Sequence, residues 1–378
     1  MIYLFTFILC LLADKFFEKK YKPVFYIAVI WLYIFLCFGY TTGSDWRNYE
    51  LYYNGSIPIN SLKDSEFGFV WLVKFCKVLI KDFWVFNGIM KMIYLHSLLK
   101  FFSKFTNKRL TAVALSFCWY TLFMLIDCPM RYMLGTIFIL YATTFLLDKR
   151  WILSIVFIMI SLTFHNMMIV SVIMAIATIL IGKRLTKINS IVLIGIFIVC
   201  QIISTMSHYF DTLLLTMSMT DSFSGYADWY SEYTTQNYQT IGAIKNIVFF
   251  IVLILNRNLI CSSPKGEYMF NGAYLYFTIG SILSMLPTGF RLAIFPGYFW
   301  VAAFTCIIYS IEYRKHILKR YIKYAFILLL GYQVISTVYS TYIYYPYTNS
   351  IPYILNEHIP YPIRSEYNIK EWDEEFRF

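Results

Sequence analysis

The sequence has 378 residues, of which 59% are hydrophobic, 21% aromatic and only 14% charged. With a mean hydropathy of +0.60, this composition excludes an ordinary soluble domain and indicates an integral membrane protein. The net charge of +11 comes mainly from small basic clusters between apolar runs, which orient a membrane protein and call for no nucleic-acid partner. The eight cysteines are scattered without a CxxC pair, so no disulfide framework or metal site is expected.

Apolar runs long enough to span a bilayer recur along nearly the whole chain, which predicts a single all-α, polytopic membrane domain over residues 1–378. We expect about 12 spans, within a range of about 10–14, because a span needs roughly 20 apolar residues. The first run has no basic residues before it and no cleavage site after it, so we interpret it as a retained helix. The expected helices lie near residues 1–13, 24–41, 84–102, 109–127, 130–147, 151–164, 166–182, 188–207, 241–256, 268–286, 289–311 and 322–342.

Basic clusters fall on every second connection between these helices, and the positive-inside rule places those connections in the cytoplasm and both termini outside. The first helix and the pair around His165 are short for a bilayer core of about 30 Å, so a tilted or half-inserted hairpin is an alternative there. The connections on the other face are longer, which predicts that the activity lies on that face. They comprise the outer loop 42–82 with an interfacial helix over Phe67–Ile80, the outer loop 208–240, the turn Pro287–Arg291 and the outer tail 342–378.

Arg131 and Arg291 each lie where an outer turn enters a helix. An arginine at that depth is costly unless it pairs with an anion, and its planar guanidinium fits phosphate oxygens. Two such groups that converge would suit a diphosphate. The alternative is that each arginine pairs with an outer carboxylate or reaches the lipid headgroups.

His165 follows a fourteen-residue apolar run and precedes Asn166 at the tip of a hairpin. A histidine there can accept a proton near neutral pH or donate a hydrogen bond to a substrate, or it can simply tie two helix ends together. Asp45 and Glu66 are the reserve proton acceptors, although the default role of Asp45 is to cap the following turn.

Trp46, Tyr49, Tyr52 and Tyr53 suit either a membrane-interface belt or a sugar-binding surface. Lys91, inside the predicted span 84–102, could contact a lipid phosphate or mark a polar cavity. P-loop, GxGxxG and HExxH patterns are absent, as is a DxD pair at an outer helix end, which favours chemistry without a metal or other cofactor.

These residues together resemble the EpsG-like branch of the Wzy-type O-antigen and exopolysaccharide polymerases. The resemblance rests on the Gly43-Ser44-Asp45-Trp46-x-x-Tyr49 stretch, the helix that opens with Arg131-Tyr132, the apolar run that ends in Phe164-His165 and the Gly289–Arg291 turn. The resemblance extends to the helical architecture of most of the chain. Its motifs are short, and their order along the chain and their common side of the predicted membrane make it specific.

The resemblance implies a GT-C-like membrane glycosyltransferase in the bacterial cytoplasmic (inner) membrane. Such an enzyme joins undecaprenyl-diphosphate-linked oligosaccharide repeat units on the periplasmic or outer face, with inversion at the anomeric carbon. Arg131 and Arg291 would then bind the diphosphate, and His165, with Asp45 or Glu66 in reserve, would be the catalytic base. Trp46, Arg47, Tyr49 and Tyr132 would contact the glycan, and membrane lipids and a chain-length regulator protein are the expected partners.

Two other functions remain open. A flippase for lipid-linked oligosaccharides would be expected to show two similar halves and charged residues near the bilayer midplane, and the sequence shows neither clearly. An O-antigen ligase or a single-sugar glycosyltransferase would share the outer arginines and differ in its acceptor.

Overall fold

The computed structural model describes residues 1–18, 22–58, 66–205, 239–283, 289–310, 315–339, 343–344, 347–356 and 370. Within these ranges every regular element is a helix, so the chain is an all-α membrane protein, as the sequence predicts. The elements are α1 (Ile2–Glu18), α2 (Lys22–Cys37), α3 (Trp46–Asn54), α4 (Phe67–Leu79), α5 (Phe83–Ser103), α6 (Arg109–Ser116), the π-helix η3 (Phe123–Asp127), α7 (Met130–Leu147), α8 (Trp151–Leu162), α9 (Met168–Ile181), α10 (Arg184–Lys187), α11 (Ser190–Thr205), α14 (Gln239–Leu255), α15 (Arg257–Cys261), α16 (Gly266–Phe277), α17 (Ile279–Leu283), α18 (Gly289–Leu292), α19 (Ile294–Tyr309), α21 (Ile317–Tyr339) and α22 (Ser350–Leu355).

Each predicted span corresponds to helix, although three of them are divided. The run 109–127 consists of α6 and η3 joined by a turn in which the Ser116 and Thr121 hydroxyls lie 2.6 Å apart. The run 268–286 contains α16 and α17, and the run 289–311 contains α18 and α19. By length and composition, α7 and α21 could each cross a membrane. With 12 residues, α8 is about 18 Å long, which confirms the predicted shortness of the segment before His165.

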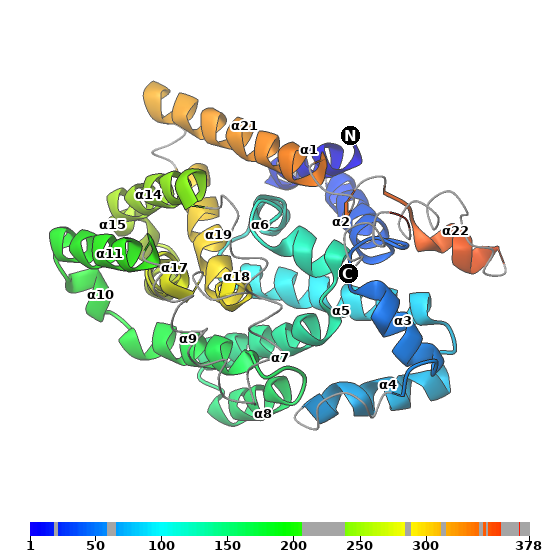
Figure 1. Ribbon diagram of the computed structural model, residues 1–378. Helices are drawn as coiled ribbons and strands as arrows, with labels where there is room; N and C mark the ends of the chain where they lie inside the picture. The colour runs from blue at the N-terminus through cyan, green and yellow to red at the C-terminus, as the bar shows by residue number, and fades with distance from the viewer. Residues whose placement is uncertain are drawn as a thin grey trace. The chain divides into compact units, whose positions relative to one another are not determined.

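The chain divides into two compact units, Met1–Ile169 with Ile311–Phe378 and Val170–Ser310. In the first unit, α7 packs against α5 and α8, and α1 packs against α2, α6 and α21 (Figure 1). In the second unit, α16 packs against α19, and α11 contacts α14 and α17. A single membrane domain over the whole chain stays a prediction.

The helices differ in how much of their apolar surface is covered. In α7, 72% of the hydrophobic window is buried, whereas in α21 only 22% is. α8 exposes most of its large apolar side chains, and Ile152, for example, is 80% exposed. Such exposure is unusual in a soluble fold and is what a lipid-facing helix needs. The first unit therefore has α7 inside and α8 and α21 outside.

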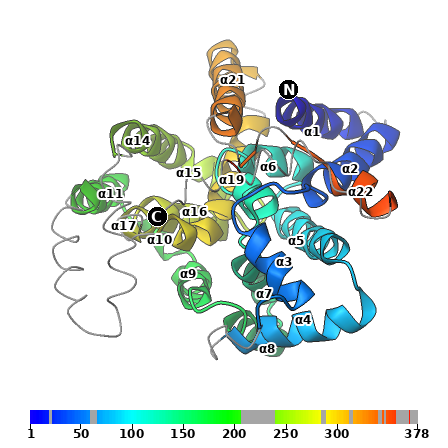
Figure 2. The same cartoon turned by 45° about the vertical axis from the view of Figure 1, so that its right-hand side comes forward.

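The predicted interfacial helix is present as α4. Phe69 and Val73 are buried, whereas Trp71 and Phe75 are 70% and 66% exposed. Its placement at the membrane surface stays a prediction. In Figure 2, α4 begins beside the end of α8, and α3 lies next to α5.

The tail of the chain is held against the loop that follows α2. The Tyr40 amide donates to the Thr348 carbonyl at 3.0 Å, and the Gly43 amide donates to the Ile343 carbonyl at 3.1 Å. Described parts of the predicted outer loop 42–82 and outer tail 342–378 are therefore neighbours. The predicted outer loop 208–240 lies outside the described residues, except for the first residues of α14.

Candidate functional site

The Gly43-Ser44 turn before α3 is attached to Asp127 at the end of η3. Both the amide and the hydroxyl of Ser44 donate to Asp127 Oδ1, at 2.6 and 2.8 Å. Gly43 has a φ of +92°, and a Cβ atom there would lie 2.4 Å from the Asp127 carbonyl oxygen. Only glycine suits this position, because it alone combines the left-handed backbone with so close an approach.

Asp127 and Arg131 belong to one short turn. The π-helix η3 ends at Asp127, and Cys128 closes it with a φ of 58° and an amide that donates to the Phe123 carbonyl at 2.9 Å. Pro129 is the N-cap residue of α7, which begins at Met130 and so carries Arg131 in its first turn. Local π-helical turns are frequent at functional sites because they redirect the chain within a few residues. Here the turn brings a carboxylate and a guanidinium to the same end of α7.

The guanidinium of Arg131 forms an ion pair with Glu66, in which Nη1 donates to Oε2. Its Nε also donates to the hydroxyl of Tyr49 at 3.5 Å. The side chain of Glu66 is 5% exposed, whereas that of Arg131 is 30% exposed. A buried carboxylate thus holds an arginine that still reaches solvent. This contact is the outer-carboxylate pairing that the sequence left open as an alternative to anion binding.

Glu66 reaches this position because α4 begins tightly against the end of α8. The Gly68 amide donates to the Thr163 carbonyl at 3.0 Å, and a Cβ on Gly68 would lie 2.1 Å from Thr163 Oγ1. Two residues beyond Thr163, His165 places its Nδ1 3.7 Å from Glu66 Oε1. The two oxygens of one carboxylate therefore face two different partners, Arg131 and His165.

The hydrogen bonds around His165 define its tautomer. The amide of Met167 donates to Nδ1 at 3.1 Å, which requires the lone pair of that nitrogen. A neutral imidazole then carries its proton on Nε2, so His165 donates through Nε2 in this arrangement. To accept a proton at Nε2, it must instead carry the proton on Nδ1, where Glu66 is the nearby acceptor. The ring of Tyr132 packs edge-on against the imidazole at 5.6 Å.

Tyr49 is a buried, neutral member of the cluster. It is 8% exposed, and its ring packs edge-on against Phe69 at 5.7 Å. Burial raises the pKa of its phenol far above the usual value near 10, against the opposing effect of Arg131. Tyr49 therefore keeps its proton at neutral pH and contributes a hydroxyl rather than a charge.

The remaining predicted residues on α3 border this cluster. Asp45 occupies the N-cap position of α3 without the side-chain hydrogen bond of a cap. Trp46 packs against Trp84 at 5.5 Å, and the indole of Trp84 donates to Glu50 at 3.1 Å. Arg47 is partly exposed. Their role in glycan binding stays a prediction.

The structure therefore brings together Arg131, Glu66 and His165, with Tyr49 and Tyr132 packed around them. Tyr132 is 1% exposed, so its ring supports His165 and offers no open face in this structure. Arg291 lies in α18 of the second unit, and its convergence with Arg131 stays a prediction.

The sequence assigned no role to Ser44 or Asp127, although Ser44 belongs to the Gly43–Tyr49 stretch and Asp127 ends the predicted span 109–127. Their contact joins positions 83 residues apart. The one available signal was an acidic residue directly before Cys128-Pro129, where a turn interrupts the apolar run.

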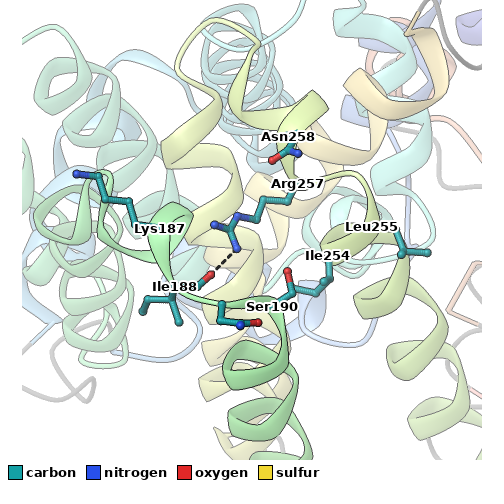
Figure 3. A pocket seen from close by; sticks show the side chains of 8 residues that line it. Lys187, Ile188, Ser190, Ile254, Leu255, Arg257 and Asn258 are labelled. Carbon is teal, nitrogen blue, oxygen red and sulfur yellow. Dashed lines mark hydrogen bonds between the residues drawn. The ribbon is translucent and has the colours of Figure 1, made fainter.

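One pocket lies in the second unit, at the start of α11 and the end of α14 (Figure 3). Its volume is about 480 Å³, and Arg257 donates from Nη1 to the Ile188 carbonyl at 2.6 Å across it. None of the site residues predicted from the sequence lines it. The lining residues are Lys187, Ile188, Asn189, Ser190, Ile254, Leu255, Arg257 and Asn258.

The cluster in the first unit combines Arg131, which is suited to bind an anion, and His165, which is suited to proton transfer. The Glu66 carboxylate pairs with Arg131 and lies near His165. These groups suit a reaction in which a phosphate leaves while a hydroxyl loses its proton. No curated protein and no solved structure matches the chain. The EpsG family model matches residues 22–354, nearly the whole length. The chain therefore belongs to the EpsG family, whose members are associated with polysaccharide polymerisation at membranes.

Proposed function

We propose that the protein joins undecaprenyl-diphosphate-linked oligosaccharide repeat units into a surface polysaccharide, on the periplasmic or outer side of the bacterial cytoplasmic membrane. The observation that supports this reaction best is the cluster of Arg131, Glu66 and His165. The family match makes polymer formation the natural activity for such a cluster.

In the proposed reaction, a hydroxyl of the incoming repeat unit attacks the anomeric carbon of the growing chain. The new glycosidic C–O bond forms as the bond from that carbon to the diphosphate oxygen breaks. The hydroxyl proton passes to the enzyme, and the electron pair leaves with the undecaprenyl diphosphate. A single displacement inverts the configuration at the anomeric carbon.

Arg131 is suited to the departing diphosphate because its guanidinium stays charged and offers several donors. Negative charge grows on the phosphate as the bond breaks, and a fixed donor in a partly dehydrated site stabilises that charge. Glu66 already offsets the charge of Arg131, so it also limits how tightly the ground-state phosphate is held. Binding that strengthens only in the transition state is the kind that raises the rate.

His165 is suited to take the proton of the acceptor hydroxyl when its own proton lies on Nδ1. That state exchanges the bond from Met167 for one to Glu66, which is 3.7 Å away. A hydrogen bond between them requires a rotation of the ring or of Glu66 that shortens this distance. Glu66 then orients His165 and stabilises the imidazolium that forms.

The test uses the purified protein in vesicles that contain lipid-linked repeat units on the accessible face. Polymerase activity predicts a ladder of longer lipid-linked glycans together with released undecaprenyl diphosphate. Transfer of repeat units across the bilayer without elongation would instead indicate a flippase. Transfer to lipid A as the preferred acceptor would indicate a ligase.

A further inference from the structure

Lys91 is the most unusual charged residue of the first unit. It lies in the middle of α5 and is only 1% exposed. Within the part of the chain that the structure describes, no carboxylate lies within ion-pair distance of it. A buried cation without a counterion is costly, and at membrane depth it indicates a functional role.

The surroundings of Lys91 point toward the start of α7. Its charge acts on the thiols of Cys37, at the end of α2, and of Cys128, just before α7. One turn earlier in α5, the Asn87 oxygen accepts from the Cys128 thiol at 3.5 Å. Side chains of a helix lean toward its amino terminus, so the Lys91 ammonium leans toward the Asp82 end of α5. The Asn87–Cys128 contact places this face of α5, on which Lys91 lies one turn further along, against the turn that carries Asp127 and Arg131.

The amino terminus of α7 favours an anion independently of Lys91. α7 has 18 residues, and its N-cap residue, Pro129, makes no side-chain hydrogen bond to the first turn. Helix amino termini carry partial positive charge and uncapped N–H groups, and phosphates bind there. Arg131 extends from the same turn.

Without Lys91 the cluster has an excess of negative charge. Glu66 offsets the charge of Arg131, and Asp127 adds a carboxylate that is bound to Ser44. These three groups together carry one net negative charge, which would repel a diphosphate. Lys91 adds one positive charge, brings the sum to zero and so removes that repulsion.

We propose that Lys91 is a fixed positive charge beneath an anion-binding site at the amino terminus of α7, and that this site takes the diphosphate of the lipid-linked substrate. The proposal rests on the proposed function and extends it by one residue. Lys91 is covered, so it acts as a positioning residue, through the field it creates at the α7 turn. Electrostatic interactions across a few ångströms of protein are strong enough for such a role, because the effective dielectric constant is about 20 there rather than about 80.

The experiment measures lipid binding to the purified full-length protein by native mass spectrometry in detergent. It compares the wild type with Lys91→Met, which keeps the length of the side chain, and with Lys91→Arg, which keeps its charge. The probes are undecaprenyl diphosphate, undecaprenol, which has the same tail without phosphate, and phosphatidylglycerol, which carries a headgroup phosphate. Thermal unfolding of each variant is followed in the same detergent.

We expect Lys91→Met to bind undecaprenyl diphosphate about tenfold more weakly, to bind undecaprenol as the wild type does, and to unfold at the same or a higher temperature. Lys91→Arg should retain most of the affinity for the diphosphate. Unchanged affinity for the diphosphate in Lys91→Met would overturn the proposal. So would an equal loss for all three lipids, or failure of Lys91→Met to fold, since either indicates a structural lysine.

Further outcomes distinguish this proposal from a site for membrane lipid and from the proposed polymerase function. Lys91-dependent binding of phosphatidylglycerol, with none of undecaprenyl diphosphate, would assign the charge to membrane lipid and overturn the substrate site. Elongation by the wild type is measured in parallel. If the wild type elongates chains while Lys91→Met binds the diphosphate normally, the polymerase function stands and the role of Lys91 fails. If Lys91 controls diphosphate binding but no elongation occurs, the anion site stands and the polymerase function fails.

Discussion

Two polar clusters of the first unit contain similar charged groups and differ in how far these groups are exposed to solvent. At one, the Asp14 carboxylate at the end of α1 accepts from the Thr111 amide at 2.7 Å, and Lys108 donates to the Asp14 carbonyl at 3.0 Å. At the other, Glu66 pairs with Arg131. Asp14 is 1% exposed and Lys108 is 7% exposed, whereas the Arg131 side chain is 30% exposed.

The difference separates a structural use of charge from a functional one. The Asp14 contacts are made with the Thr111 amide and the Lys108 side chain, at the start of α6, so they fix one helix against another. The Glu66 contacts go to side chains that can exchange partners, and one of these side chains reaches solvent. A polar cluster that binds substrate has to remain partly open, because the substrate must reach its polar groups. The following predictions test this contrast.

The largest effect is expected for Arg131→Ala, which removes the donors for the departing diphosphate. Loss of a donor that stabilises developing charge lowers turnover by about 10²–10³-fold. Elongation of lipid-linked repeat units measures the loss, and Arg131→Lys, which keeps a charge without the planar fork, should recover only part of it. Arg291→Ala should behave similarly if both arginines hold the diphosphate. Normal chain lengths in both alanine variants would remove the arginine clamp from the mechanism.

Glu66→Gln tests the carboxylate that lies between Arg131 and His165. We expect a rate about 10²-fold lower, because the neutral amide no longer stabilises the imidazolium of His165.

The matched variant at the structural cluster is Asp14→Ala. It should cost about 1–3 kcal/mol of stability by leaving the buried Thr111 amide without its acceptor, while the surviving protein keeps its rate. The contrast fails if Glu66→Gln mainly lowers the unfolding temperature or if Asp14→Ala mainly lowers the rate.

Gly43→Ala should disturb the attachment of the α3 turn to Asp127. The added methyl group would meet the Asp127 backbone at 2.4 Å at a residue whose φ is +92°. We expect about 1–3 kcal/mol of destabilisation from the left-handed backbone alone, together with a reduced rate. Gly195→Ala in α11 is the control, because nothing lies within 4 Å of its added methyl group. Thermal unfolding and elongation are compared for both variants, and equal behaviour would show that the turn has no such constraint.

Tyr49→Phe should have the smallest effect. It removes the hydroxyl that accepts from Arg131 at 3.5 Å, a long hydrogen bond, while the ring remains packed against Phe69. A loss of about 0.5–1.5 kcal/mol corresponds to a rate roughly twofold to tenfold lower. A loss as large as that of Arg131→Ala would instead assign the phenol a direct part in the reaction.

Much of the fold followed from one-dimensional signals. Runs of apolar residues located the helices, including the short segment before His165 and the amphipathic helix α4. The divisions of three runs were not predicted. In the run 109–127, hydropathy does not register a turn in which the Ser116 and Thr121 hydroxyls lie 2.6 Å apart. Side-chain hydrogen bonds of this kind allow a polar break inside an otherwise apolar stretch.

The candidate site was only partly predictable. Arg131, Glu66 and His165 could each be selected from the sequence, because an ionisable side chain at a helix end in a membrane protein is costly and therefore indicates a functional role. That Glu66 contacts Arg131 and faces His165 depends on the close approach of Gly68 to Thr163, which no spacing in the sequence reveals. That no described carboxylate lies within ion-pair distance of Lys91 was equally hidden, because it can be recognised only once the neighbours of Lys91 are known.

The sequence by itself determined that this is a helical membrane protein with an arginine and a histidine at the ends of two apolar runs. Those properties depend on hydropathy and charge, which are local and additive along the chain. Only the tertiary structure decided which carboxylate lies between them, which tautomer of His165 is hydrogen-bonded and which lysine lies buried away from every carboxylate that the structure describes. These properties depend on distances between residues far apart in the chain, and such distances are set by the packing of helices against one another.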